Sequence, residues 1–172
     1  MSSPVRSEGI QLLQGASMSS TQTHAQAVAN VAEGSLIATV DLPISPERAF
    51  RALASPEIME WWVRAGVFDT REWSGDVRMG GTWQASGMAR GQPYTLEGEF
   101  ITVDSPRQLA HTWHLRGTPD APTTVTYTLE PLDHGTRITL HHAGFTSRQA
   151  CENTATGWQT SFDRLLEILT DS

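Results

Sequence analysis

The sequence from residue 147 to residue 169 reads SRQACENTATGWQTSFDRLLEIL, and it constrains how the rest of the chain can fold. Apolar side chains recur in it every three or four residues, so they form one continuous stripe on a helix. The stripe consists of Cys151, Ala155, Trp158, Phe162, Leu165 and Leu169. At roughly 1.5 Å per residue such a helix is about 35 Å long, which is enough to cross a whole sheet. We therefore expect a long C-terminal helix that packs its stripe on a sheet.

Seven segments ahead of this helix have the pattern or the flanking turns of β-strands. In the sixth, Val125, Tyr127 and Leu129 alternate with polar residues, which is typical of a strand with one buried face. Turn residues at 104–107 and 133–135 separate neighbouring segments, and strands joined by turns this short must pair antiparallel. The seven segments are residues 35–42, 68–73, 82–89, 94–103, 108–116, 123–130 and 136–143.

Two short helices are predicted between the first and second of these strands. Ser45-Pro46-Glu47 and Ser55-Pro56-Glu57 repeat one helix-start signal, with a serine N-cap, a proline in the first turn and an acidic residue beside it. We therefore expect helices over residues 46–53 and 56–63. The resulting order is strand, two short helices, six strands and one long helix, which is an α+β fold.

The first 34 residues differ in composition from the rest of the chain. They contain no Phe, Trp or Tyr and only three charged residues, so they lack the large apolar groups that offset the entropy of ordering. We expect residues 1–34 to be a disordered N-terminal tail, with a short helix over 24–32 as the alternative, and residues 35–172 to be one domain. The sequence has neither the pattern of a signal peptide nor a membrane-spanning apolar stretch, which favours a cytoplasmic protein.

The charge balance excludes several kinds of chemistry. The chain has a net charge of −7, with twelve arginines and no lysine, so Schiff-base catalysis, a pyridoxal anchor and a P-loop are all ruled out. An acidic chain repels polyanions, and nucleic acid is therefore not an expected partner. The single cysteine, Cys151, has neither a cation nor a histidine beside it in the sequence, and we expect it to be a buried structural thiol.

Four short stretches resemble one known family. They are WW at residues 61–62, VRMGGTW at 77–83, LEGEF at 96–100 and TGW at 156–158. Together with the order of elements, they make residues 36–170 similar to the START-like (SRPBCC) helix-grip superfamily, and within it to the bacterial family named after activator-of-heat-shock-protein-ATPase homologues. The resemblance implies a seven-stranded curved antiparallel sheet that encloses a cavity with the two short helices and the long C-terminal helix. It also implies a START-like ligand-binding domain, because most members bind ligands and share no common reaction.

The inward-facing aromatic residues and two histidines are the candidates for contact with a ligand. Large rings can fill a core or line a cavity for a flat apolar molecule, and His111 and His142 could orient its polar groups. The alternative is that these rings are plain core and that both histidines are neutral. The candidate ligand-binding residues are Trp61, Trp62, Trp83, Phe100, His111, Trp113, His142, Trp158 and Phe162.

No catalytic residue and no cofactor are required by the leading hypothesis, which is non-catalytic binding of an apolar, aromatic or polycyclic small molecule. Proteins of the fold that this sequence resembles include, in antibiotic producers, some that sequester, or are sacrificed to, a reactive natural product such as an enediyne, so self-resistance is a specific form of this hypothesis. A small cyclase, dehydratase or hydrolase is the alternative, with His111 or His142 as general base and Glu97 as its partner. A solvated strand face is the simpler interpretation of Glu97.

A chaperone ATPase cofactor is the third hypothesis, which the family resemblance suggests. A metal site is not expected, because the histidines have no metal-ligand spacing. A membrane is not an expected partner either, because the chain shows no basic amphipathic helix.

Overall fold

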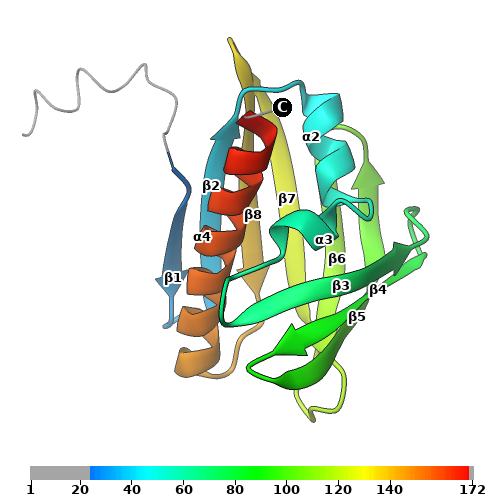
Figure 1. Cartoon of the computed structure of the whole chain (residues 1–172), viewed down its shortest axis with the longest axis vertical. Helices are drawn as coiled ribbons and strands as arrows, with labels where there is room; N and C mark the ends of the chain where they lie inside the picture. The colour runs from blue at the N-terminus through cyan, green and yellow to red at the C-terminus, as the bar shows by residue number, and fades with distance from the viewer. Residues whose placement is uncertain (1–23, 171–172) are drawn as a thin grey trace, which may run out of the picture.

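The long C-terminal helix is α4, Arg148–Thr170, and it lies across one face of a single antiparallel sheet (Figure 1). The computed structural model describes residues 24–170. Every residue of the apolar stripe is buried, so the predicted face of the helix is the one that packs on the sheet. Cys151 is buried as well, and its thiol donates to the carbonyl oxygen of Ser35 at 3.3 Å.

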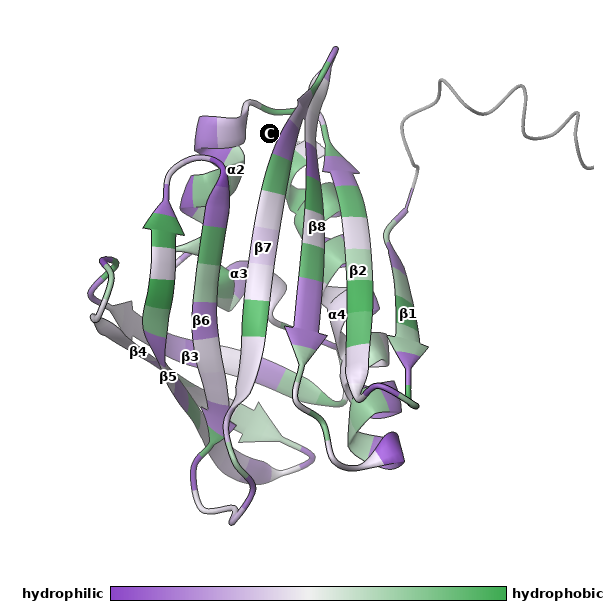
Figure 2. Ribbon diagram, turned by 180° about the vertical axis from the view of Figure 1, so that it is seen from behind, coloured by the Kyte–Doolittle hydropathy of each residue, from purple (hydrophilic) through white to green (hydrophobic). Residues whose placement is uncertain are grey.

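The sheet has eight strands in the order β1-β2-β8-β7-β6-β5-β4-β3. The α+β helix-grip architecture is therefore confirmed, while the predicted count of seven strands is one too few. Buried positions alternate along β7 and β8, as in strands with one buried face, and on both strands hydrophobic bands are separated by white or purple ones (Figure 2). The strands are β1 Gln26–Asn30, β2 Ser35–Leu42, β3 Phe68–Gly75, β4 Thr82–Ala89, β5 Gln92–Asp104, β6 Gln108–Leu115, β7 Thr123–Leu132 and β8 Gly135–Ala143.

Two short helices follow β2, as predicted, although the second is shorter than expected. Helix α2, Pro46–Leu53, starts at Ser45, whose hydroxyl accepts from the Arg48 amide at 3.2 Å. Helix α3, Ile58–Trp61, begins two residues later than the predicted start at residue 56. The Ser55 hydroxyl accepts from the amide two residues ahead, at Glu57, and this contact makes a tight turn where the sequence predicts the first helical turn.

The eighth strand, β1, lies in the segment that the sequence predicts to be a tail. The tail prediction, and the alternative of a helix over 24–32, must both be corrected for residues 24–34, whereas residues 1–23 lie outside the described residues. β1 pairs with β2 on one side. On its other side, the Ala25 amide donates to Asp163 at 2.7 Å and the Ala27 amide donates to Gln159 at 3.1 Å. Small alanines fit beneath α4, so the strand needs no large apolar anchor.

Replacing Asp163 with alanine is expected to release β1 from α4. The free energy of unfolding should fall by about 1–2 kcal/mol, because the buried Ala25 amide loses a charged acceptor. Thermal unfolding and amide hydrogen exchange at Ala25 measure the effect. Glu167→Ala is the matched control, since within residues 24–170 that carboxylate pairs with Arg164 alone, at the surface, and its loss should cost less than about 0.5 kcal/mol. Equal losses in the two variants would contradict the tie between β1 and α4.

The sheet is curved, and the curvature sets the position of the site. Strands β3 to β5 run at a steep angle to β2, β7 and β8 (Figure 1). Register shifts occur between Thr70 and Glu72 in β3 and between Phe100 and Thr102 in β5, and bulges of this kind bend a strand. The bent half of the sheet faces the first turns of α4. Within residues 24–170, no helix is long and apolar enough to cross a membrane.

Candidate functional site

A cavity of about 640 Å³ lies between the first half of α4 and the bent half of the sheet. Its walls come from the segment after α3, the start of β3, the β4–β5 hairpin, the end of β6 and one face of α4. The apolar part of the lining consists of Trp62, Val67, Phe68, Ala89, Leu96, Trp113, Leu115 and Trp158. This volume is within the range of small-molecule sites, roughly 300–1,000 Å³.

Three of the predicted ligand-binding tryptophans meet at one corner of this cavity. The ring centroids of Trp62 and Trp113 are 5.3 Å apart, those of Trp113 and Trp158 are 5.5 Å apart, and those of Trp62 and Trp158 are 6.1 Å apart. We call these three residues the tryptophan corner. The indole nitrogen of Trp62 is buried and has no hydrogen-bond partner within the described residues.

A glycine on α4 leaves room beside this corner. Gly157 lines the cavity, and a Cβ atom added to it would meet no atom within 4 Å. A glycine in a helix interior costs about 1 kcal/mol relative to alanine. A glycine at position 157 allows the helix to lie close either to a ligand or to the sheet. Because the space beside Gly157 is empty, the first interpretation is favoured.

The other six predicted ligand-binding residues lie behind the cavity lining. Each is at most 4 % exposed, and none of them lines the cavity. Trp61 donates its indole N–H to the Ala52 carbonyl at 3.0 Å. The Trp83 indole N–H donates to the Thr112 carbonyl at 3.1 Å. This bond passes next to Gly98, where the pairing between β5 and β6 is interrupted. The six residues are Trp61, Trp83, Phe100, His111, His142 and Phe162.

His142 is held in a chain of hydrogen bonds inside the core. The Trp158 indole N–H donates to His142 Nδ1 at 3.1 Å. Its Nε2 therefore carries the proton and donates to the Thr123 hydroxyl at 2.7 Å, which in turn donates to the Trp113 carbonyl at 3.3 Å. Burial lowers the pKa of His142 to about 3, with smaller contributions from His111 and His141. Both ring nitrogens have partners, so His142 is a neutral residue that supports the tryptophan corner.

His111 is also a core residue. Its Nδ1 lies 2.9 Å from the Thr112 carbonyl oxygen, and its ring packs between Trp83, at 4.9 Å, and Phe100, at 5.9 Å, measured between ring centroids. Burial lowers the pKa of His111 to about 4, although the hydrogen bond to Thr112 opposes this effect. The structure thus agrees with the neutral core histidine that the sequence left open as an alternative.

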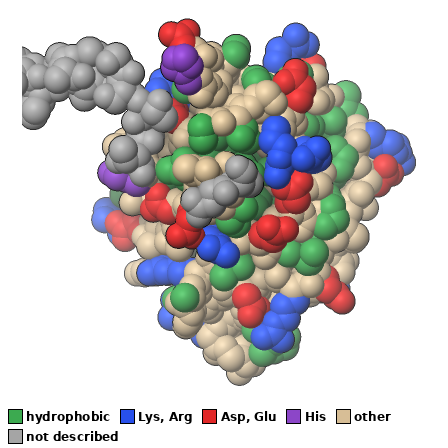
Figure 3. Space-filling model, turned by 45° about the horizontal axis from the view of Figure 1, so that its top comes forward, with side chains coloured by type: hydrophobic (Ala, Val, Ile, Leu, Met, Phe, Trp, Pro, Cys, Tyr) green, Lys and Arg blue, Asp and Glu red, His purple; other side chains and the backbone are tan. Residues whose placement is uncertain are grey.

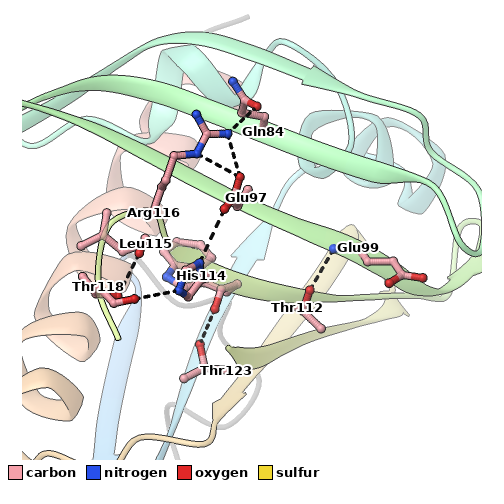
Figure 4. A network of polar contacts seen from close by, with 10 residues as sticks. Gln84, Glu97, Glu99, Thr112, His114, Leu115, Arg116, Thr118 and Thr123 are labelled. Atoms are coloured by element: carbon pink, nitrogen blue, oxygen red, sulfur yellow. Dashed lines mark hydrogen bonds and ion pairs between the residues drawn. The ribbon is translucent and has the colours of Figure 1, made fainter. Parts of the chain in front are cut away.

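Glu97 lies beside His114 and Arg116 (Figure 4), on the outer face of the sheet and not in the cavity. Its carboxylate accepts from Arg116 at 2.7 Å and lies 3.6 Å from His114 Nδ1. The hydrogen bond from Arg116 is the main reason that its pKa is lowered. The structure therefore does not assemble the predicted general-base pair of His111 or His142 with Glu97.

The outer face around Glu97 carries a larger hollow, which we call the outer groove. Its volume is about 930 Å³, and its lining includes Asp76, Gln84, Glu97, Glu99 and His114. The lining is more polar than that of the cavity, and Arg116 already bridges two of its side chains, Glu97 and Gln84. We place the candidate site in the smaller cavity because that one combines apolar walls with a few polar groups, as ligand sites do.

The polar lining of the cavity is the part that sequence reasoning missed. Thr70 and Tyr94 lie with their hydroxyls 2.7 Å apart, and burial raises the pKa of Tyr94. Tyr94 is two residues before Leu96 in β5, so the strand period places both on the same face, and this signal could have identified Tyr94. Arg64 and Arg90 also line the cavity, and both lie next to turns, where no periodicity predicts the direction of a side chain. Within residues 24–170, no group of three or more His, Cys, Asp or Glu residues could hold a metal ion.

Comparison with known proteins gives a family and a set of similar folds. The family described as Activator of Hsp90 ATPase homolog 1-like protein matches residues 43–170. CV1439 from Chromobacterium violaceum is 24% identical, with a TM-score of 0.73 over 79% of this chain and 96% of that chain. Ms6760 from Mycobacterium smegmatis is 19% identical, with a TM-score of 0.73 over 86% and 97%.

CalU16 from Micromonospora echinospora is similar as well. It is 20% identical, with a TM-score of 0.59 over 86% of this chain and 85% of that chain. At these identities the likeness to the three structures supports the fold alone. The sequence has no significant match to a curated protein.

Proposed function

The chain belongs to the family of activator of Hsp90 ATPase homolog 1-like proteins, and from this premise we propose that it binds an apolar small molecule with aromatic rings in the cavity between α4 and the bent half of the sheet. The observation that carries the proposal is the cavity itself, which is about 640 Å³ in volume and has the tryptophan corner as one wall. Flat rings can stack on these indoles or meet them edge to face.

Binding without catalysis is the form of the proposal that the side chains favour. An enzyme of the predicted kind would need a histidine that reaches the ligand and titrates near neutral pH. His142 has both nitrogens hydrogen-bonded, and neither His111 nor His142 lines the cavity. The lining instead offers the hydroxyls of Thr70 and Tyr94. These donate to the Trp62 and Asp69 carbonyls, so they can orient a ligand by accepting its hydrogen bonds, without exchanging its protons.

Self-resistance is the specific form of binding that we propose to test first. In that form the ligand is a reactive natural product, such as an enediyne or another polyketide, and the protein sequesters it in the cytoplasm. The choice is motivated by the fold, because proteins of this fold in antibiotic producers include some that sequester such products.

Tryptophan fluorescence provides the test of binding. Titration with a panel of polycyclic aromatic natural products should quench or shift the emission, because three indoles line the cavity. Trp113→Phe should reduce the response, whereas Trp73→Phe should leave it unchanged, since Trp73 does not line the cavity. If no member of a broad panel changes the emission, the proposal fails. Stimulation of a purified chaperone ATPase by the protein without any ligand would instead support the hypothesis that the protein is a cofactor of such a chaperone.

A further inference from the structure

Two arginines differ from all the others that the structure describes. Of the eleven arginines in residues 24–170, nine lie within 4.0 Å of an Asp or Glu oxygen. On the face shown in Figure 3, basic and acidic side chains accordingly lie next to one another. Arg64 and Arg90 have no such ion pair within the described residues, and both line the cavity. The unpaired positive charges are thus gathered at the candidate site.

The backbone brings these two arginines to the same edge of the cavity. The Arg90 amide donates to the Val67 carbonyl at 2.8 Å, and the Val67 amide donates to the Arg64 carbonyl at 2.9 Å. Val67 therefore links the turn after α3 to the β4–β5 hairpin. Both residues line the same cavity, so one ligand bound there lies near both of them.

The charge around them is positive, although the protein as a whole is acidic. None of the described residues that line the cavity is Asp or Glu. The outer groove has the opposite character, with Asp76, Glu97 and Glu99 in its lining. In a chain with a net charge of −7, a cavity whose charged residues are two unpaired arginines favours an anion over a neutral or cationic ligand.

The conformation of Arg90 adds an independent observation. Its φ is 51°, and the next residue, Gly91, has a φ of 81°. This is the two-residue hairpin turn in which Asn, Asp or Gly usually occupies the first position, because a Cβ atom crowds the backbone there. Among the described residues other than glycine, only Arg90 has a positive φ. Residues held in such conformations cluster at functional sites, and Arg90 lies at the edge of the cavity.

We propose that the ligand of the cavity is an amphipathic organic anion. This inference rests on the proposed binding function and specifies its ligand class. An oxyanion group, such as a carboxylate or sulfonate, lies between Arg64 and Arg90, whose guanidinium groups present planar pairs of donors to it. The ring system extends from there to the tryptophan corner, whose indoles it can stack on or meet edge to face.

A matched pair of fluorescent probes tests the proposal. Anilinonaphthalene sulfonate is anionic, and N-phenyl-naphthylamine has the same ring system without the charge. We expect the anion to bind about tenfold or more tightly, as one charge-assisted contact would provide. Its affinity should fall as salt is raised from 0.05 M to about 0.5 M, because partly exposed charges are screened, whereas the affinity of the neutral probe should change little.

Variants of the two arginines test whether the preference for the anionic probe comes from these residues. Arg64→Gln and Arg90→Gly should each weaken the anionic probe by about tenfold and leave the neutral probe within about twofold. Arg90→Gly should also raise the melting temperature, since glycine accepts the positive φ. Arg107→Gln is the control, because Arg107 is exposed and pairs with Asp104 away from the cavity.

The outcomes separate this inference from the proposed function. If both probes bind with equal affinity, with no effect of salt or of the two arginine variants, the anion preference is overturned and binding stands. If neither probe binds the wild-type protein, the proposed function itself fails for ligands of this shape. Binding of sulfonates and of aromatic carboxylates alike would support the shared oxyanion chemistry, and a preference for neutral carboxamides over carboxylates would contradict it.

Discussion

Replacing Gly157 with phenylalanine is expected to block ligand binding and to stabilise the fold at the same time. A side chain added at Gly157 meets no atom within 4 Å at its Cβ and extends into the cavity. The new ring occupies space beside the tryptophan corner, so affinity for an aromatic ligand should fall by at least about tenfold. Phenylalanine is also a better helix former than glycine, by roughly 0.5 kcal/mol.

The opposite signs of these two effects make the experiment decisive. Most substitutions that abolish binding also destabilise a protein, whereas this one should raise the melting temperature. Gly157→Ala is the graded control, because it adds only a methyl group to a cavity of about 640 Å³. It should gain about 1 kcal/mol of stability and leave affinity nearly unchanged. Unchanged affinity in Gly157→Phe would show that the ligand does not occupy this part of the cavity.

The architecture follows from patterns that are local in sequence. The stripe from Cys151 to Leu169 predicts a helix with one buried face, and that face packs on the sheet. Short turns predict antiparallel neighbours, and all the pairs of the sheet are antiparallel. β1 escapes prediction because its order depends on Asp163 and Gln159, which lie more than 130 positions further along the chain.

The site could be predicted only in part, and the reason is geometric. Strand alternation places His111 and His142 on the inner face, where the structure has them buried. An inner face has two kinds of position, those that line a cavity and those that other side chains cover. Alternation does not distinguish them, because the difference depends on where the bulges of β3 and β5 bend the sheet. Trp62, Trp113 and Trp158 line the cavity, whereas Trp61 and Trp83 lie behind it.

The loss of the His142 side chain is expected to cause a large decrease in stability. His142→Ala removes two hydrogen bonds, leaves the Trp158 indole N–H without its acceptor and opens a void next to Trp113. Together these losses should lower the free energy of unfolding by about 3–5 kcal/mol. The neighbouring exposed residue provides the control, since His141→Ala should change stability by less than about 0.5 kcal/mol. Chemical denaturation at pH 7.5 measures both variants.

The same residue should also make the fold sensitive to acid. In the folded state the pKa of His142 is about 3 and that of His111 about 4, against an ordinary value of 6.5. Between pH 6.5 and 4 the unfolded chain therefore binds more protons at these residues than the folded chain does. Above pH 6.5 these two histidines make their full contribution to the free energy of unfolding. As the pH falls below 6.5, that contribution decreases by roughly 1 kcal/mol per pH unit for each histidine.

The slope of stability between pH 6.5 and pH 5 tests this assignment, because most carboxylates titrate below that window. His142→Ala should reduce the slope by about half, since His111 alone then remains, while His141→Ala should keep it. The measurement bears on function as well as on stability. A histidine that could be protonated in the folded protein would show little slope and would be available as an acid or base. A slope that is unchanged in His142→Ala would contradict the neutral, hydrogen-bonded state of His142 in the folded protein.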